Sequence, residues 1–290
     1  MLGVVPTPSF VSDAVAARLR LFLDRMRGES ADYGADAEGL IDSAADTLVG
    51  GKRLRARFCH AGWQAVARFG DRDAEESAAL WDVCAALEIF QSAALVHDDL
   101  IDNSDTRRGR PAAHRALESA HVGAGWRGDP AAFGRSSAIL LGDLLVAWSD
   151  DLLEDAIEPL PHAAAVRREY GRMRRDVTVG QFLDIAEESA WSVHATDSHV
   201  ERALRVVSFK SARYSIEQPL VLGAAIADAD DDQLLALRRF GHPVGMAFQL
   251  RDDLLGVYGD AAVTGKPAGD DLREGCLLYT SDAADDLLCV

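Results

Sequence analysis

The chain has 290 residues, 48% of them hydrophobic, with a formal net charge of −17 and a pI of about 4.8. This length and apolar content allow a large buried core, as one large domain or two small ones. The acidity argues against nucleic acid or an anionic membrane surface as a partner, so any bound anion needs a local basic cluster or metal ions.

Targeting and redox features are sparse. The four cysteines form no CxxC pair, which argues against disulfides and structural zinc. The N-terminus lacks a basic segment followed by an apolar one, and no apolar run approaches the ~20 residues that a membrane span needs. We therefore expect a soluble, reduced, cytoplasmic protein without a membrane span.

Apolar residues recur at spacings of three and four along most of the chain, and strand-like alternation is scarce. Several of the resulting helices exceed 20 residues and are apolar on more than one side, which is typical of large all-α bundles. Glycine and proline mark the breaks between them. The predicted helices cover residues 8–26, 37–48, 53–69, 74–103, 131–156, 162–188, 196–227 and 231–258.

The third predicted helix follows a glycine pair in the sequence GGKRLRARF, residues 50–58. Backbone N–H groups at a helix start favour phosphate, and Lys52 and Arg55 share a helix face, so both could clamp one anion. A solvated basic helix start is the alternative interpretation. The two other lysines of the chain are Lys210, in mid-helix, and Lys266, in a Gly/Pro loop.

The fourth predicted helix ends in three aspartates, and a basic segment follows it. Asp98 and Asp102 share one helix face, and Asp99 lies about 100° around it. Carboxylates at the end of a helix face the negative pole of its dipole and repel each other unless a cation joins them. Oxygen ligands of this kind suit Mg²⁺. An Asp-Asp pair alone is weak evidence for a metal site in a chain with 47 acidic residues, but the arginines that follow it, Arg107 and Arg108, strengthen that evidence.

A second acidic cluster, Asp252 and Asp253, comes late in the last predicted helix. A Phe-Gln pair precedes each cluster, at residues 90–91 and 248–249. Two such clusters on facing helices could hold several Mg²⁺ ions, which would in turn bind a diphosphate.

Together these residues resemble the trans-isoprenyl diphosphate synthases, or polyprenyl synthetases, over residues 9–275. The resemblance implies an all-α, single-domain helical bundle of the isoprenoid synthase type, with a central cavity between the two aspartate-rich helices, and a homodimer. We expect the polyprenyl synthetase domain to cover residues 1–275. Six motifs carry the resemblance in order: GGKRLR, DDLID with TRRGRPAAH, GQFLD (180–184), KSA (210–212), FQLRDD and TGKPAGDDL.

The same resemblance implies a Mg²⁺-dependent condensation of isopentenyl diphosphate with an allylic diphosphate, catalysed by Asp98, Asp102, Asp252, Lys210 and Lys266. Three Mg²⁺ ions would be bound by Asp98, Asp102 and Asp252, with Asp99 and Asp253 supporting, and Asp184 would lie in the metal-facing wall. The allylic diphosphate would contact Arg107, Lys210, Ser211, Gln249 and Lys266. Isopentenyl diphosphate would contact Lys52, Arg55, Gln91 and Arg108.

Product length depends on the floor of the cavity. Ala93 and Ala94 lie five and four positions before Asp98, where bulky aromatic residues would stop growth at C15. Two alanines leave the floor open, which predicts a product of C20 or longer, of the geranylgeranyl diphosphate synthase type.

Two other functions stay open. A class I terpene cyclase shares the aspartate-rich motif, but it has no isopentenyl diphosphate for GGKRLR to hold. A catalytically silent helical subunit of a prenyl synthase is the second alternative, and the intact first motif argues against it.

The end of the chain departs from the family pattern. Residues 276–290 read CLLYTSDAADDLLCV, with Cys276 where a lysine would contact diphosphate. This segment resembles the translation of a transposon-type sequencing adapter. We therefore expect a non-native tail after a domain that is incomplete at its C-terminus, and an inactive chain is one consequence of such a truncation.

Overall fold

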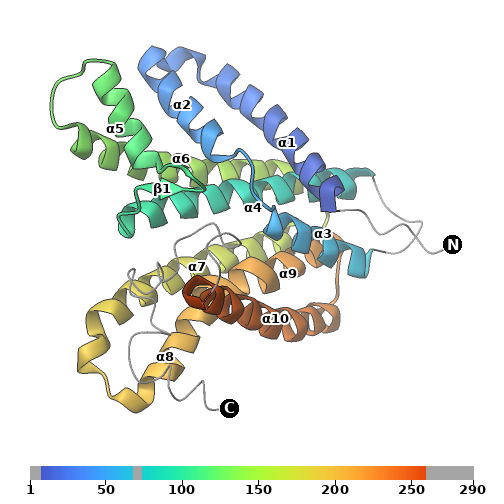
Figure 1. The fold of residues 1–290 in the computed structure, drawn as a ribbon. Helices are drawn as coiled ribbons and strands as arrows, with labels where there is room; N and C mark the ends of the chain where they lie inside the picture. The colour runs from blue at the N-terminus through green and yellow to red at the C-terminus, as the bar shows by residue number, and fades with distance from the viewer. Residues whose placement is uncertain (1–7, 68–73, 259–290) are drawn as a thin grey trace. The chain divides into compact units, whose positions relative to one another are not determined.

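The computed structural model describes residues 8–67 and 74–258, which are almost entirely helical (Figure 1). The α-helices are α1 (Pro8–Glu29), α2 (Ala35–Thr47), α3 (Leu54–Val66), α4 (Ala74–Ile101), α5 (Ala113–Gly123), α6 (Pro130–Ile157), α7 (Ala163–Ala190), α8 (His199–Val206), α9 (Gln218–Ile226) and α10 (Asp231–Tyr258). Single 3₁₀ turns cover Ala31–Tyr33, Trp191–Val193 and Thr196–Ser198, and the segment η4 (Val207–Glu217) is a π-helix. Strands β1 (Thr106–Arg107) and β2 (Arg110–Pro111) form a small hairpin.

This architecture confirms the all-α class and most of the predicted helices. Three features differ from the prediction: helix α5, the β1–β2 hairpin, and the division of the helix expected over 196–227 into several segments. Helix α5 was missed because two of its three buried positions are histidines, His114 and His121, around Leu117. Their spacing is helical, but the residue types do not form an apolar stripe.

The chain folds as two compact units, and no linker in the sequence marks the division. Unit 1 is assigned to Met1–His60 and Phe69–Ala163, and unit 2 to Ala61–Arg68 and Ala164–Val290. Helix α3 therefore begins in unit 1 and ends in unit 2. The central cavity expected from the family resemblance stays a prediction.

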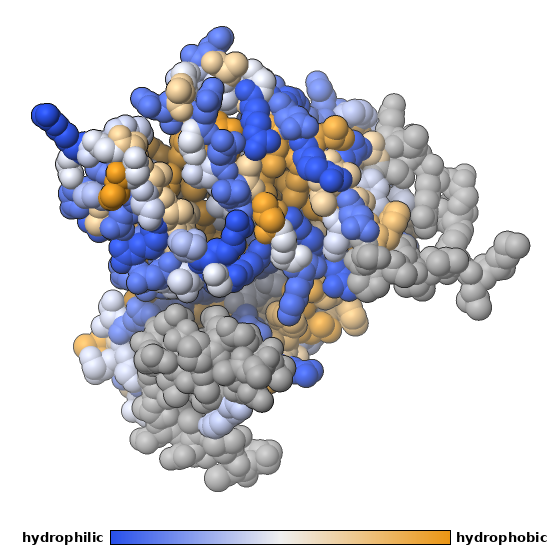
Figure 2. All heavy atoms as spheres, turned by 45° about the horizontal axis from the view of Figure 1, so that its top comes forward, coloured by the Kyte–Doolittle hydropathy of each residue, from blue (hydrophilic) through white to orange (hydrophobic). Residues whose placement is uncertain are grey.

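The core of unit 1 is the packing of α4 against α6. Residues 83–87 of α4 have no exposed surface, because this apolar stretch is covered on every side. Ser149 of α6 donates a hydrogen bond to the Ala86 carbonyl (2.8 Å). Helix α1 packs alongside, where Phe22 meets Trp148 edge to face at 5.7 Å. Figure 2 shows hydrophilic side chains on the outer ridges of unit 1 and hydrophobic ones deeper between them.

Two helices of the described part are long and apolar enough to match a membrane span, by length and composition only. They are Ala78–Ile101 and Pro130–Ile157, with 72% and 33% of their most apolar windows buried inside the protein. Buried core helices of soluble proteins pass the same test, and these two pack on each other. They are weak grounds for a membrane location.

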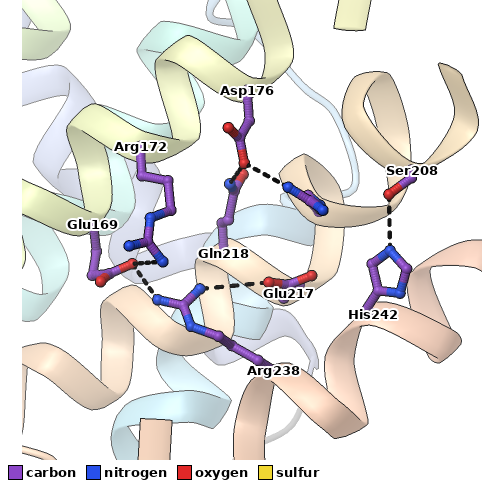
Figure 3. Close-up of polar contacts among 9 residues, drawn as sticks. Glu169, Arg172, Asp176, Ser208, Glu217, Gln218, Arg238 and His242 are labelled. Carbon is purple, nitrogen blue, oxygen red and sulfur yellow. Dashed lines mark hydrogen bonds and ion pairs between the residues drawn. The ribbon is translucent and has the colours of Figure 1, made fainter. Parts of the chain in front are cut away.

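Unit 2 contains α7–α10 and η4, together with the end of α3. Every residue of α9 is buried. Close backbone crossings hold the unit together: a methyl group on Gly62 would lie 1.9 Å from the Leu220 carbonyl oxygen, and one on Gly245 would lie 2.4 Å from that of Ala212. Arg238 of α10 donates to Glu169 of α7 and to Glu217 at the end of η4 (Figure 3).

Candidate active site

The segment after α4 is a hairpin with a two-residue loop. Thr106 pairs with Pro111 and Arg107 with Arg110 in antiparallel register. Arg108 and Gly109 have φ values of 54° and 73°, and a type I′ turn requires positive φ at both loop positions. The hairpin separates two neighbouring arginines and gives each a different partner.

Arg107 turns back onto the end of α4. Its Nε donates to Asp99 Oδ1 (2.7 Å), its Nη2 donates to the same oxygen, and Nη2 lies 3.7 Å from Asp98 Oδ2. Burial raises the pKa of the Asp99 carboxyl, and the Arg107 guanidinium partly offsets this. Arg107 thus sits directly against the first aspartate motif.

Arg108 lies on the glycine loop instead. A methyl group on Gly51 would lie 3.1 Å from both terminal guanidinium nitrogens of Arg108. Arg108 therefore lies beside Gly51, the residue before Lys52. That Arg108 and Lys52 hold one anion stays a prediction. Lys52 is exposed, Arg55 is partly buried at the start of α3, and Gln91 is partly buried on α4, two turns before Asp98.

The three carboxylates of the first motif differ in exposure. The Asp98 side chain is 24% exposed and Asp102 is exposed, whereas the Asp99 side chain is 4% exposed. The Asp102 N–H donates to the Asp98 carbonyl (2.9 Å), so both residues belong to one final helical turn. Their accessible carboxylate oxygens suit Mg²⁺, while Asp99 is occupied by Arg107. Among the described residues, no group of three or more His, Cys, Asp or Glu side chains is arranged to hold a metal ion.

The second aspartate pair, in unit 2, also has one exposed and one buried member. Asp252 is exposed and Asp253 is buried. Asp253 Oδ1 accepts a hydrogen bond from Gln249 Nε2 (2.7 Å), one helical turn earlier on α10. In each pair, therefore, the second aspartate is held by a side chain that the family resemblance assigns to the allylic diphosphate.

Lys210 lies on η4, which packs against α10, the helix that carries the second aspartate pair. Its Nζ donates to Asp184 Oδ2 of α7 at 2.5 Å. A methyl group on Gly180 would lie 2.4 Å from the Lys210 backbone N, so α7 and η4 touch backbone to backbone here. Burial raises the pKa of Glu188, and Asp184 one turn earlier adds to this. Ser211 follows on η4 and is partly buried.

The two alanines of the predicted chain-length floor differ in burial. Ala93 has no exposed surface and Ala94 is partly buried. Of the two, only Ala94 presents surface that a growing chain could meet. The part of the hypothesis that rests on Ala93 therefore has no support from its packing.

Some predicted positions cannot be placed. Lys266 and the tail at residues 276–290 lie outside the described residues. The prediction also overlooked two buried residues, Arg53 within the basic loop and Glu88 on α4, which pair with each other. A glutamate inside an otherwise apolar stretch of α4 was the available signal, because a buried charge needs a partner.

The fold and the motifs define an all-α protein with aspartate pairs near the ends of two helices and a basic glycine loop. The chain belongs to the polyprenyl synthetase family, whose model matches residues 38–280. That match ends five residues past the expected domain boundary at 275.

Individual relatives agree with this assignment. A geranylgeranyl diphosphate synthase of Mycobacterium tuberculosis is 38% identical over 190 residues, covering 66% of this chain and 48% of the relative. Heptaprenyl diphosphate synthase component 2 of Geobacillus stearothermophilus is 32% identical, and the match covers 92% of this chain and 71% of the relative. A crystal structure of the Corynebacterium glutamicum geranylgeranyl pyrophosphate synthase, complexed with isoprenyl diphosphate and magnesium, has a TM-score of 0.84 and 42% identity, covering 93% and 74%. The chain spans about half the length of the curated relatives that it first matches.

Proposed function

We propose that the chain is a trans-prenyltransferase, which condenses isopentenyl diphosphate with an allylic diphosphate. The observation that carries the proposal is the hairpin after α4, which directs Arg107 to the aspartates and Arg108 to the glycine loop. Two anionic substrates need two separate cationic sites, and this hairpin supplies one arginine to each.

The residues have distinct roles in the proposed reaction. Asp98, Asp102 and Asp252 would hold Mg²⁺, which when bound neutralises charge on the leaving diphosphate. Arg107 and Lys210 would add positive charge where that diphosphate departs. Lys52, Arg55 and Arg108 would hold isopentenyl diphosphate so that its double bond is close to the allylic carbon. Gln91 would complete the contacts to isopentenyl diphosphate, and Gln249 and Ser211 would complete those to the allylic diphosphate.

We propose a product of C20 or longer. The partly buried Ala94 offers little bulk one turn before Asp98, and the relatives include synthases named for geranylgeranyl, geranylfarnesyl and heptaprenyl products. A homodimer and a cytoplasmic location stay proposals. Support for the homodimer comes from the large apolar side chains of Ile139 and Leu140, which are 48% and 60% exposed on α6.

An elongation assay separates the candidate functions. The chain is incubated with Mg²⁺, isopentenyl diphosphate and allylic diphosphates of increasing length, and the products are analysed by mass spectrometry. Longer diphosphates are expected. Hydrocarbons would identify a terpene cyclase, and no turnover would favour the silent-subunit alternative.

A further inference from the structure

Within GGKRLR, one basic residue does not face solvent. Arg53 is 9% exposed, while Lys52 just before it is exposed. Its backbone φ of 49° is in the left-handed region, which is uncommon for a residue with a side chain and requires support from its surroundings. Gly50 and Gly51 also have positive φ values, 77° and 90°. Three of these four consecutive residues thus hold an unusual backbone conformation, so something must fix the loop.

Arg53 and Glu88 supply that support. Arg53 Nη2 donates to the Leu48 carbonyl at 2.5 Å, and its Nη1 lies 3.4 Å from Glu88 Oε2. Glu88 of α4 is 6% exposed, so the pair is enclosed by protein. The two ends of the guanidinium therefore bind the beginning of the loop to the core helix of unit 1.

The second oxygen of Glu88 caps the helix that carries Arg55. Glu88 Oε1 accepts a hydrogen bond from the Ala56 N–H at 3.3 Å. Ala56 is the third residue of α3, and its N–H is one of those that a helix leaves unpaired. An N-cap side chain usually accepts this bond, but Arg53, in the N-cap position, carries only donors. Glu88 therefore performs from α4 the capping that the loop cannot perform for itself.

We propose that Arg53 and Glu88 are a buried positioning pair, which sets the geometry of Lys52 and Arg55 for the diphosphate of isopentenyl diphosphate. The inference rests on the proposed function and adds to it two residues that do not touch the ligand. Arg53 is not a ligand itself, because its donors are directed to Leu48 and Glu88 inside the protein.

Binding of isopentenyl diphosphate alone tests the pair without requiring turnover. The variant Glu88→Gln keeps the size of the side chain but leaves the Arg53 charge unpaired. We expect its Kd for isopentenyl diphosphate, measured by calorimetry, to rise at least about tenfold, because displaced ligands lose orientation. Arg53→Lys keeps the charge but loses the planar guanidinium that reaches both Leu48 and Glu88. This variant should also raise the Kd for isopentenyl diphosphate.

Glu169→Gln is the matched control. Glu169 is also 6% exposed and also pairs with an arginine guanidinium, that of the partly buried Arg238, but it lies in unit 2. Melting temperatures are recorded for all variants. The proposed role of the pair is supported if Glu88→Gln binds isopentenyl diphosphate more weakly and Glu169→Gln does not, while both variants lose a similar amount of melting temperature. Unchanged binding in Glu88→Gln, or equal weakening in both variants, would overturn it. A wild-type chain that does not bind isopentenyl diphosphate would contradict the proposed function, and the pair's role with it.

Discussion

In both aspartate pairs, one carboxylate is accessible and the other is buried against a hydrogen-bond donor. Asp98 and Asp252 are the accessible members, and Asp99 and Asp253 are held by Arg107 and Gln249. The buried members therefore orient side chains that would contact diphosphate, and the accessible members are suited to bind metal. These different roles predict different effects of substitution.

Asp98→Asn should lower kcat by about 10²–10³-fold, because one carboxylate that neutralises charge through Mg²⁺ is lost. Steady-state kinetics with saturating Mg²⁺ measure this. Asp105→Asn is the control, since Asp105 lies just beyond the same helix but pairs on the surface with Arg115. Equal loss of activity in both variants would contradict the assignment of Asp98.

Ala94→Phe should shorten the main product, because a ring at this partly buried position would block the growing chain. Ala93→Phe should instead cost about 1–3 kcal/mol of stability, since Ala93 is fully buried and the core has no room for a ring. Product length by mass spectrometry and unfolding by denaturant distinguish the two. An unchanged product in Ala94→Phe would refute the floor hypothesis.

Among the elements, the contact between α7 and η4 depends on a glycine. Gly180→Ala would place a methyl group 2.4 Å from the Lys210 backbone N, which cannot move aside as a flexible side chain would. We expect a loss of about 1–3 kcal/mol in the free energy of unfolding and a lower kcat, because Lys210 is displaced.

Gly171→Ala, on the same helix, is the matched control for this contact. The nearest atom to its added methyl group is Arg175 Nη1 at 3.3 Å, which belongs to a flexible side chain. Higher helix propensity should stabilise this variant by up to about 1 kcal/mol. Similar stability of the Gly180 and Gly171 variants would contradict the proposed tight crossing.

The packing of α1 on α4 should depend on pH through Asp82. Burial raises the pKa of Asp82 above its ordinary 3.8, and Arg18, whose Nε lies 3.3 Å away, offsets this only in part. The native state therefore holds this proton to higher pH than the unfolded state, and the stability that this carboxyl contributes falls as pH rises through the raised pKa.

Comparison with Asp82→Asn isolates this effect, because the amide does not titrate. The stability of the wild type relative to this variant should decrease as the pH rises from below 3.8 towards neutrality. Urea unfolding at a series of pH values measures the difference. An increase over that range would show that Arg18, rather than burial, dominates.

For the molecule as a whole, the sequence predicted the long helices because their apolar spacing is regular. It did not predict the hairpin, since Arg108-Gly109 is not a usual signal for a type I′ turn. The π-helical character of η4 was also missed, because its residues read as ordinary helix.

The candidate site was predictable in part. Aspartates at helix ends and a glycine loop with lysine carry a recognisable chemistry, so Asp98, Asp102 and Lys52 could be selected from the sequence. The pairing of Arg107 with Asp99 and of Glu88 with Arg53 could not, because both depend on how a loop folds back onto α4. The division into two units also left no mark in composition.

Incorporation of labelled isopentenyl diphosphate into an allylic primer tests the central claim most directly. The chain is incubated with farnesyl diphosphate and the label, once with Mg²⁺ and once with excess chelator, and the chain length of every labelled diphosphate is measured. The proposed function predicts labelled trans-polyprenyl diphosphates of C20 or longer with Mg²⁺ and none with chelator. A chain that binds both substrates but transfers no label, or that transfers it equally well without Mg²⁺, would contradict it.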